Sequence, residues 1–178
     1  MGRLIAAAAL MLLRSFALPV TPEPAPAAAA FKKLCALAGE WEGSVQWSGA
    51  RHDSGRMHAS YSLTGVGSAV VETLTMDGTP IMTSVYHLDG GDLRMTHYCG
   101  ARNQPRLKAR RIDVVQGILD FEFVDITNLS SSEAGHVSGV EIRLLDADRF
   151  ILTFLFEEGG QKSRERIELA RVPPKRST

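Results

Sequence analysis

Cysteine is scarce in this sequence, with only Cys35 and Cys99 in 178 residues. No C-x-x-C or H-x-x-x-H spacing occurs, so the pattern of a structural zinc site is missing. We also expect no disulfide, because Cys35 falls in a short helical segment and Cys99 at an inward position near a strand end. A nucleophile elbow and a phosphate-binding loop are missing as well, and this removes two common indications of catalysis.

The chain has no excess of either charge, since 20 basic residues balance 20 acidic ones. Its basic cluster comprises Arg102, Arg106, Lys108, Arg110 and Arg111. No aromatic residues alternate with these side chains, and a run of this kind is typical of a solvated face. We therefore expect no nucleic-acid partner.

Long hydrophobic runs are missing too. Residues 4–13 form an apolar run, but it is too short to span a bilayer. Arg3 precedes this run, and a segment rich in proline and alanine follows it. This pattern is typical of a secretory signal peptide and spacer over residues 1–30, with a cleavage site near Ala27 to Ala30. We expect a periplasmic or secreted protein whose mature form has no integral membrane segment.

What the chain does contain is a series of about ten short β-type runs, separated by turn residues and lacking any long amphipathic helix. This spacing predicts an all-β fold, an antiparallel up-and-down barrel over residues 31–171 that opens with a short helix over 31–38. A two-sheet sandwich is the alternative. The basic, proline-containing residues 172–178 are expected to be a disordered tail.

The most strongly marked hairpin lies in residues 81–99, where two β-type runs flank Asp89-Gly90-Gly91-Asp92. The glycines suit a tight turn, and pairing across it sets Ser84 against His97 and Tyr86 against Met95. Side chains two apart share a face, so Tyr86 and His97 point inward. The histidine is either a core residue satisfied by Ser84 or water, or a ligand-binding or proton-transfer group.

Two further hairpins place carboxylates on inward faces. Pairing around residues 65–68 sets Tyr61 against Glu72, which is either bonded to that tyrosine or available to a polar ligand. Pairing around Gly159-Gly160 puts Glu165 on the face of Ile167.

Two further segments contribute candidates. The alternation of residues 119–125 brings Asp125 to the end of another inward row, and the loop over 100–106 carries Asn103 and Arg106 at the rim. The predicted ligand-binding residues are thus Glu72, Tyr86, His97, Asn103, Arg106, Asp125 and Glu165.

The segment Gly39-Glu40-Trp41-Glu42-Gly43, which follows the short helix, resembles the G-x-W opening of lipocalin-like (calycin) barrels. A longer pattern over residues 31–170 is similar to a family of uncharacterised bacterial secreted or periplasmic proteins. Its parts are LAGEWEG, VVETL, YHLDGGDLRMTHYC, NQPR and FEFVDITNL. These resemblances imply a barrel, and they imply no particular activity.

Nitrobindin-like haem barrels share the G-x-W-x-G opening, and that resemblance implies a proximal histidine on a late strand. This chain has no histidine after His136. His97 and His136 are then the inward candidates for an axial ligand. We expect neither haem nor another cofactor.

These observations favour a barrel that binds a small apolar ligand through the anchors Glu72, His97, Asp125 and Glu165. The walls of its cavity would be Trp41, Tyr61, Tyr86, Met95, Phe121, Phe123 and Phe154. One alternative is a barrel filled with side chains that acts as an envelope interaction protein. Another is an acid–base enzyme that uses His97 and a carboxylate, although binding is favoured over catalysis.

Overall fold

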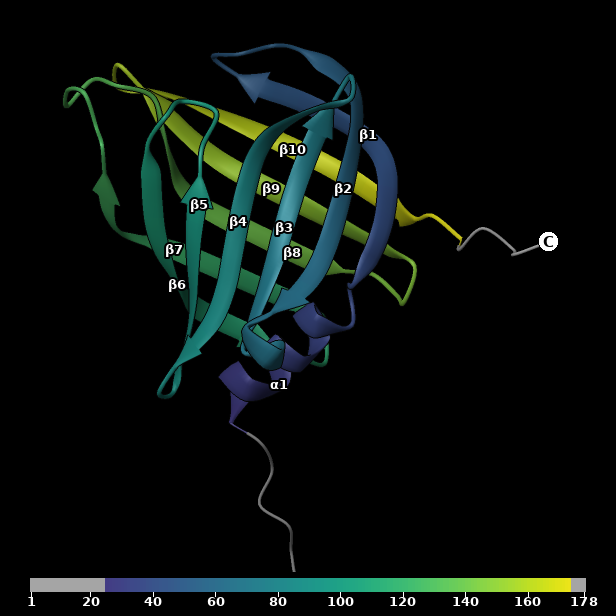
Figure 1. Cartoon of the computed structure of the whole chain (residues 1–178). Helices are drawn as coiled ribbons and strands as arrows, with labels where there is room; N and C mark the ends of the chain where they lie inside the picture. Colours follow the sequence, from purple (N-terminus) through teal and green to yellow (C-terminus); the bar gives the residue numbers. More distant parts are fainter. Residues whose placement is uncertain (1–24, 174–178) are drawn as a thin grey trace, which may run out of the picture.

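The computed structural model describes residues 25–173, which form a closed barrel of ten antiparallel strands. Each strand pairs with its neighbours along the chain, and β10 closes the barrel against β1 (Figure 1). The prediction of an up-and-down barrel is confirmed, and the sandwich alternative is wrong. The elements are α1 (Pro26–Cys35), β1 (Gly39–Gly49), β2 (Ser54–Thr64), the 3-10 turn η1 (Gly65–Gly67), β3 (Ala69–Met76), β4 (Thr79–Asp89), β5 (Asp92–Tyr98), β6 (Gln104–Asp113), β7 (Ile118–Thr127), β8 (His136–Leu144), β9 (Arg149–Glu158) and β10 (Gln161–Arg171).

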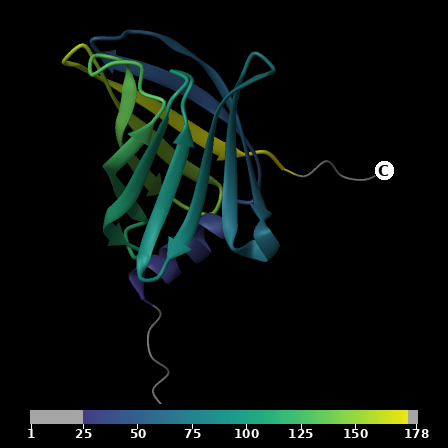
Figure 2. The ribbon, with the colours of Figure 1, turned by 60° about the vertical axis from the view of Figure 1, so that its left-hand side comes forward.

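Helix α1 lies across one end of the barrel, which we call the α1 end (Figure 1, Figure 2). Ala27, Ala30 and Leu34 are buried against the strands. Arg171 of β10 holds the chain at the C-terminal end of the helix, because its guanidinium donates to the carbonyl oxygens of Ala36 at 2.9 Å and Ala38 at 3.0 Å. The chain that leaves the helix is therefore tied to the last strand.

The helix begins at Pro26, five residues before the predicted start at residue 31. Proline suits the first turn of a helix, and alanine is the strongest helix former, so the chain is helical from Pro26 despite its lack of a clear apolar stripe there. Residues 1–24 and 174–178 lie outside the described part of the chain. The signal peptide and the disordered tail therefore stay predictions.

The Gly-x-Trp-x-Gly segment begins β1, and each of its two glycines is required for a different steric reason. Gly39 has a φ of 131°, a conformation that favours glycine. A Cβ at Gly43 would overlap the carbonyl oxygen of Glu168 on β10, so the two strands approach closely there. Between the glycines, the Trp41 indole donates to the Leu37 carbonyl at 2.8 Å, which fixes the turn between helix and strand.

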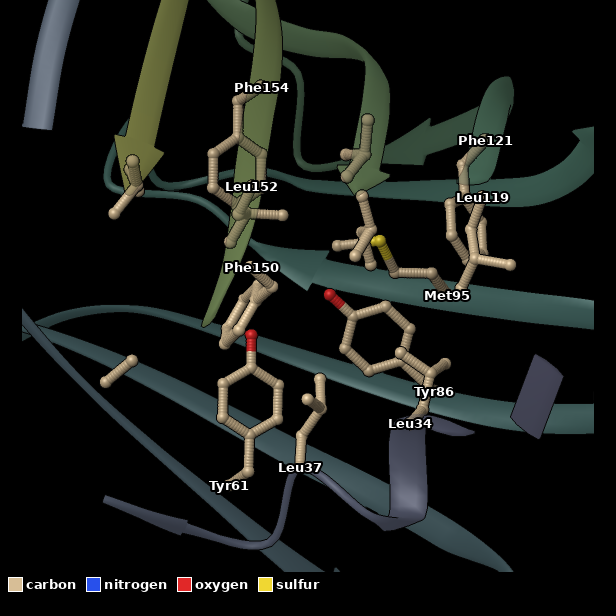
Figure 3. Packing of buried hydrophobic residues seen from close by; sticks show 14 of the residues in the cluster. Leu34, Leu37, Tyr61, Tyr86, Met95, Leu119, Phe121, Phe150, Leu152 and Phe154 are labelled. Atoms are coloured by element: carbon tan, nitrogen blue, oxygen red, sulfur yellow. The ribbon is translucent and has the colours of Figure 1, made fainter. Parts of the chain in front are cut away.

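The α1 end of the barrel interior is filled by large side chains (Figure 3). Trp41, Tyr61, Tyr86, Met95, Phe121 and Phe154 are all buried in the barrel interior and outside the cavities, so the sequence-based expectation that they line a ligand cavity is wrong. Their rings pack directly on one another, as when Trp41 meets Phe150 edge-on at 4.7 Å. Phe123, the seventh expected lining residue, is 38% exposed and packs on His136 at 5.7 Å instead.

Replacing Trp41 with alanine should destabilise the protein by about 3–5 kcal/mol, because the barrel wall cannot collapse into the space that the indole leaves. Equilibrium denaturation in urea measures this change. Val115→Ala, at an almost fully exposed turn position, is the control and should change stability by less than about 0.5 kcal/mol. A loss of under about 1 kcal/mol for Trp41→Ala would contradict its place in the core.

Candidate functional site

A row of four polar side chains crosses the inner wall on four neighbouring strands. The strand registers pair Tyr61 of β2 with Glu72 of β3, Glu72 with Ser84 of β4, and Ser84 with His97 of β5. We call these four residues the polar row. The glycine-marked hairpins therefore predicted the Tyr61–Glu72 and Ser84–His97 pairs correctly, and the Glu72–Ser84 pair joins them. All four side chains are buried.

Glu72 is the centre of the polar row and is completely buried. Its carboxylate accepts hydrogen bonds from the hydroxyl groups of Tyr61 at 2.5 Å, Tyr86 at 2.9 Å and Ser84 at 3.0 Å. Burial raises the pKa of Glu72 above its ordinary value, and the three hydrogen bonds oppose that rise. The structural interpretation of Glu72, a bond from Tyr61, is thus confirmed and extended by two further donors (Figure 3 shows both tyrosine hydroxyl groups pointing inward).

His97 ends the polar row, with its Nδ1 atom 3.0 Å from the Ser84 hydroxyl and its ring 4.7 Å from that of Phe154. Burial lowers the pKa of His97 to about 3, so the ring is neutral near pH 7. Because the Ser84 hydrogen is donated to Glu72, the imidazole satisfies the serine oxygen by carrying its own proton on Nδ1. The Nε2 atom is buried without a partner among the described residues.

The end of the barrel opposite α1, which we call the mouth, holds an open cavity of about 950 Å³. It is formed by the loops after β1, β5 and β7 and by the adjoining strand ends. Met82 and Cys99 line it, and each lies two residues from a member of the polar row on the same strand face. The cavity therefore begins one layer of side chains beyond the polar row. Its apolar lining residues include Trp47, Met76, Ile81, Met82, Val137 and Phe156.

Glu165 of β10 reaches this cavity from the inner wall and is only 4% exposed. Cross-strand neighbours Trp47 and Phe154 flank it. Among residues 25–173, no donor forms a hydrogen bond or ion pair with its carboxyl group. Burial raises the pKa of Glu165 to about 7, and the positive charge of Arg51 opposes part of that rise.

Arg51, in the loop after β1, covers one side of the mouth. Its guanidinium lies over the rings of Phe156 at 4.3 Å and Trp47 at 5.2 Å, and it pairs with Glu158 at 2.8 Å. Sequence reasoning missed Arg51, because it sits in an irregular loop and its partner is 107 residues away. The pairing of β1 with β10, which brings the two residues together, is a feature of barrel closure that no local pattern reveals.

Two predicted site residues, Arg106 and Asp125, lie on the outer surface and pair with each other at 2.5 and 2.8 Å. Asp125 was expected at the end of an inward row, and that expectation is wrong. Between the Leu107–Phe123 and Arg106–Asp125 pairs, β7 has one residue more than β6, and this bulge turns Asp125 outward.

The structure brings Glu72, Tyr86 and His97 together and separates them from the other predicted residues. Asn103 is buried in the loop after β5, where its amide donates to the Gly135 carbonyl at 2.8 Å. This bond ties two mouth loops together. Glu165 alone of the predicted set lines the mouth cavity.

The two histidines expected as axial ligands of a haem lie away from the mouth cavity. Neither His97 nor His136 lines the cavity, and the Nδ1 atom of His136 is 3.1 Å from the carbonyl of Ala134. In residues 25–173, no group of three histidine, cysteine or acidic side chains could hold a metal ion. The described helix is also too short to cross a bilayer.

Glu165→Gln should stabilise the protein more at about pH 8 than at about pH 5. The wild-type carboxyl keeps its proton up to about pH 7 when folded, whereas the unfolded chain releases it near pH 4.5. Stability that is present at low pH is therefore lost as the pH rises, by roughly 3 kcal/mol, and glutamine avoids this loss.

Urea denaturation of both proteins at the two pH values measures the effect. Glu168→Gln removes an exposed carboxylate from the same strand and is the control, with little expected change. If the difference in stability between Glu165→Gln and wild type is the same at both pH values, the claim that burial raises the pKa of the Glu165 carboxyl is contradicted.

Comparisons with known proteins support the fold. No family model and no curated protein matches the sequence. Rv2717c from M. tuberculosis is 15% identical, with a TM-score of 0.53 over 81% of this chain and 98% of that one. A protein of unknown function of the DUF3598 family from Nostoc punctiforme is 16% identical, with a TM-score of 0.54 over 77% of this chain and 48% of that one.

The matched region thus spans about half the length of the DUF3598 family protein. At these identities the likeness concerns the fold alone, a ten-stranded antiparallel barrel. The finer resemblance to lipocalin-like barrels stays a prediction.

Proposed function

We propose that the protein is an exported barrel that binds a small, mostly apolar molecule in its mouth. The observation that carries this proposal is the cavity of about 950 Å³, which combines apolar walls with a buried carboxyl group that has no hydrogen-bond or ion-pair partner in residues 25–173. Small-molecule sites generally have this composition, with few polar groups among apolar side chains. A carboxyl group without a partner is costly to bury unless something else binds it.

The filled α1 end restricts where a ligand could bind. The polar row and the aromatic side chains around it fill that part of the described interior, whereas the mouth holds the cavity. A depression of about 690 Å³ over β1, β9 and β10 lies on the outer surface, where Glu42, Arg56 and Arg149 are exposed. No charged side chain that lines this depression is buried, whereas Glu165 at the mouth is, and the mouth is therefore the better candidate.

The geometry favours binding over acid–base catalysis. His97 is neutral near pH 7, is buried in the polar row and is separated from the cavity by a layer of side chains. A general base must reach the proton that it removes. The interaction alternative also gains little, because Arg106, Lys108 and Arg111 of the basic cluster each face an acidic residue on a neighbouring strand.

Export can be tested at the N-terminus of the exported protein. Ala27 and Ala30 pack in the core as part of α1, so cleavage at the site expected near these residues would remove part of the helix. A cleavage that keeps α1 intact leaves a new terminus at or before residue 26. Sequencing the N-terminus of the periplasmic or secreted fraction measures this. Intact Met1 in a cytoplasmic fraction would contradict export.

Ligand binding can be tested with the neutral fluorophore N-phenyl-1-naphthylamine, which brightens in apolar sites. We expect saturable emission with wild-type protein. Ala101→Trp, in the exposed loop at the mouth, should weaken binding about tenfold, a loss of about 1.4 kcal/mol, by narrowing the cavity.

The matched control is Ala147→Trp, the same change in an exposed turn at the α1 end, which should leave the affinity unchanged. Binding that is absent, or equally affected by both tryptophans, would contradict a site in the mouth.

A further inference from the structure

The charged groups at the mouth are unevenly balanced. Arg51 contributes a positive charge to the cavity lining, and Glu158 binds it at 2.8 Å. Two further acidic residues, Asp53 and Glu165, line the same cavity. Glu165 is the buried member of this set, and it has no donor among the described residues. The mouth therefore offers a ligand a hydrogen-bond acceptor in surroundings of net negative character.

We propose that the mouth binds an organic amine, with its ammonium group on the Glu165 carboxylate and its apolar body against Trp47 and Phe156. This inference rests on the proposed function and names the chemical class of the ligand. An ammonium group supplies the hydrogen-bond donors that the Glu165 carboxylate lacks, and a positive charge in direct contact, whereas Arg51 acts on Glu165 without pairing with it.

The aromatic side chains of the mouth support a cation. The Arg51 guanidinium lies over Phe156 at 4.3 Å and over Trp47 at 5.2 Å, so the mouth already holds one cation against its aromatic rings. An anionic ligand would instead meet Glu165, Glu158 and Asp53 and could be balanced only by an arginine that is already paired. A neutral alcohol or amide could donate a hydrogen bond to the carboxyl group, but it would not compensate the net negative charge of the mouth.

The proposal makes binding dependent on pH. The titratable and charged groups around Glu165 are Arg51, His52 and Asp53 from the loop after β1, Glu158 from β9, and Cys99 after β5. An ammonium ligand needs Glu165 ionised, and burial raises the pKa of this carboxyl to about 7. Amine binding should therefore tighten as the pH rises from about 5.5 to about 8, since the ligand then no longer has to displace a proton.

The test uses two fluorophores of similar size, dansylcadaverine, which ends in an ammonium group, and dansyl pentylamide, which ends in a methyl group. With the full-length exported protein at about pH 8, we expect the cationic probe to bind at least tenfold more tightly, the scale of a charge-assisted hydrogen bond. The difference should shrink at about pH 5.5 as Glu165 takes up its proton.

Glu165→Gln should remove the preference for dansylcadaverine and leave the affinity for dansyl pentylamide within about twofold, since glutamine keeps the size of the side chain. Glu168→Gln, the matched change on the outer face of the same strand, should preserve the preference. Thermal unfolding of each variant confirms that the compared proteins are folded.

The outcomes separate the two proposals. If neither probe binds in a saturable manner, the proposed ligand-binding function is wrong. If dansyl pentylamide binds as tightly as dansylcadaverine, or if Glu165→Gln keeps the preference, the mouth binds ligands but the amine assignment is wrong. Tighter binding of the anionic probe dansyl-6-aminohexanoate would also overturn it and would implicate Arg51.

Discussion

The structure depends on satisfying one buried carboxylate, Glu72, inside a closed barrel. Its three donors come from β2 and β4, and each is in reach only because the registers of β2, β3 and β4 are fixed. If one of these strands slipped by one residue, its inward side chains would turn outward and its apolar residues would face solvent. The cost of burying an unsatisfied carboxylate thus stabilises one register over its neighbours.

The polar row also divides the barrel interior into two parts. Toward α1, aromatic and aliphatic side chains fill the space, and Arg171 ties the helix to the last strand. Toward the mouth, the side chains stop short and a cavity opens, with Glu165 as its buried polar group. Glu72 and Glu165 are both inward carboxylates, yet within the described residues one has three donors and the other has none. We therefore interpret the first as structural and propose the second for ligand binding.

Much of this arrangement follows from local sequence patterns. Alternation and glycine turns predicted the two hairpins that align Tyr61 with Glu72 and Ser84 with His97, because a tight turn fixes the register of both its strands. Asp125 was misplaced because a bulge depends on how two strands fit together, and alternation within one strand cannot reveal it. The extent of filling and the place of Arg51 were also beyond prediction, since both arise from strands that meet only when the barrel closes.

The central claim, a filled α1 end and a binding mouth separated by the polar row, is tested most directly by mapping backbone amide NMR shifts during titration with N-phenyl-1-naphthylamine. The account predicts saturable shifts at the mouth, around Trp47, Cys99, Val137 and Glu165, and little change at Trp41. Shifts centred on α1 or on the outer surface, or none at saturating probe, would contradict it.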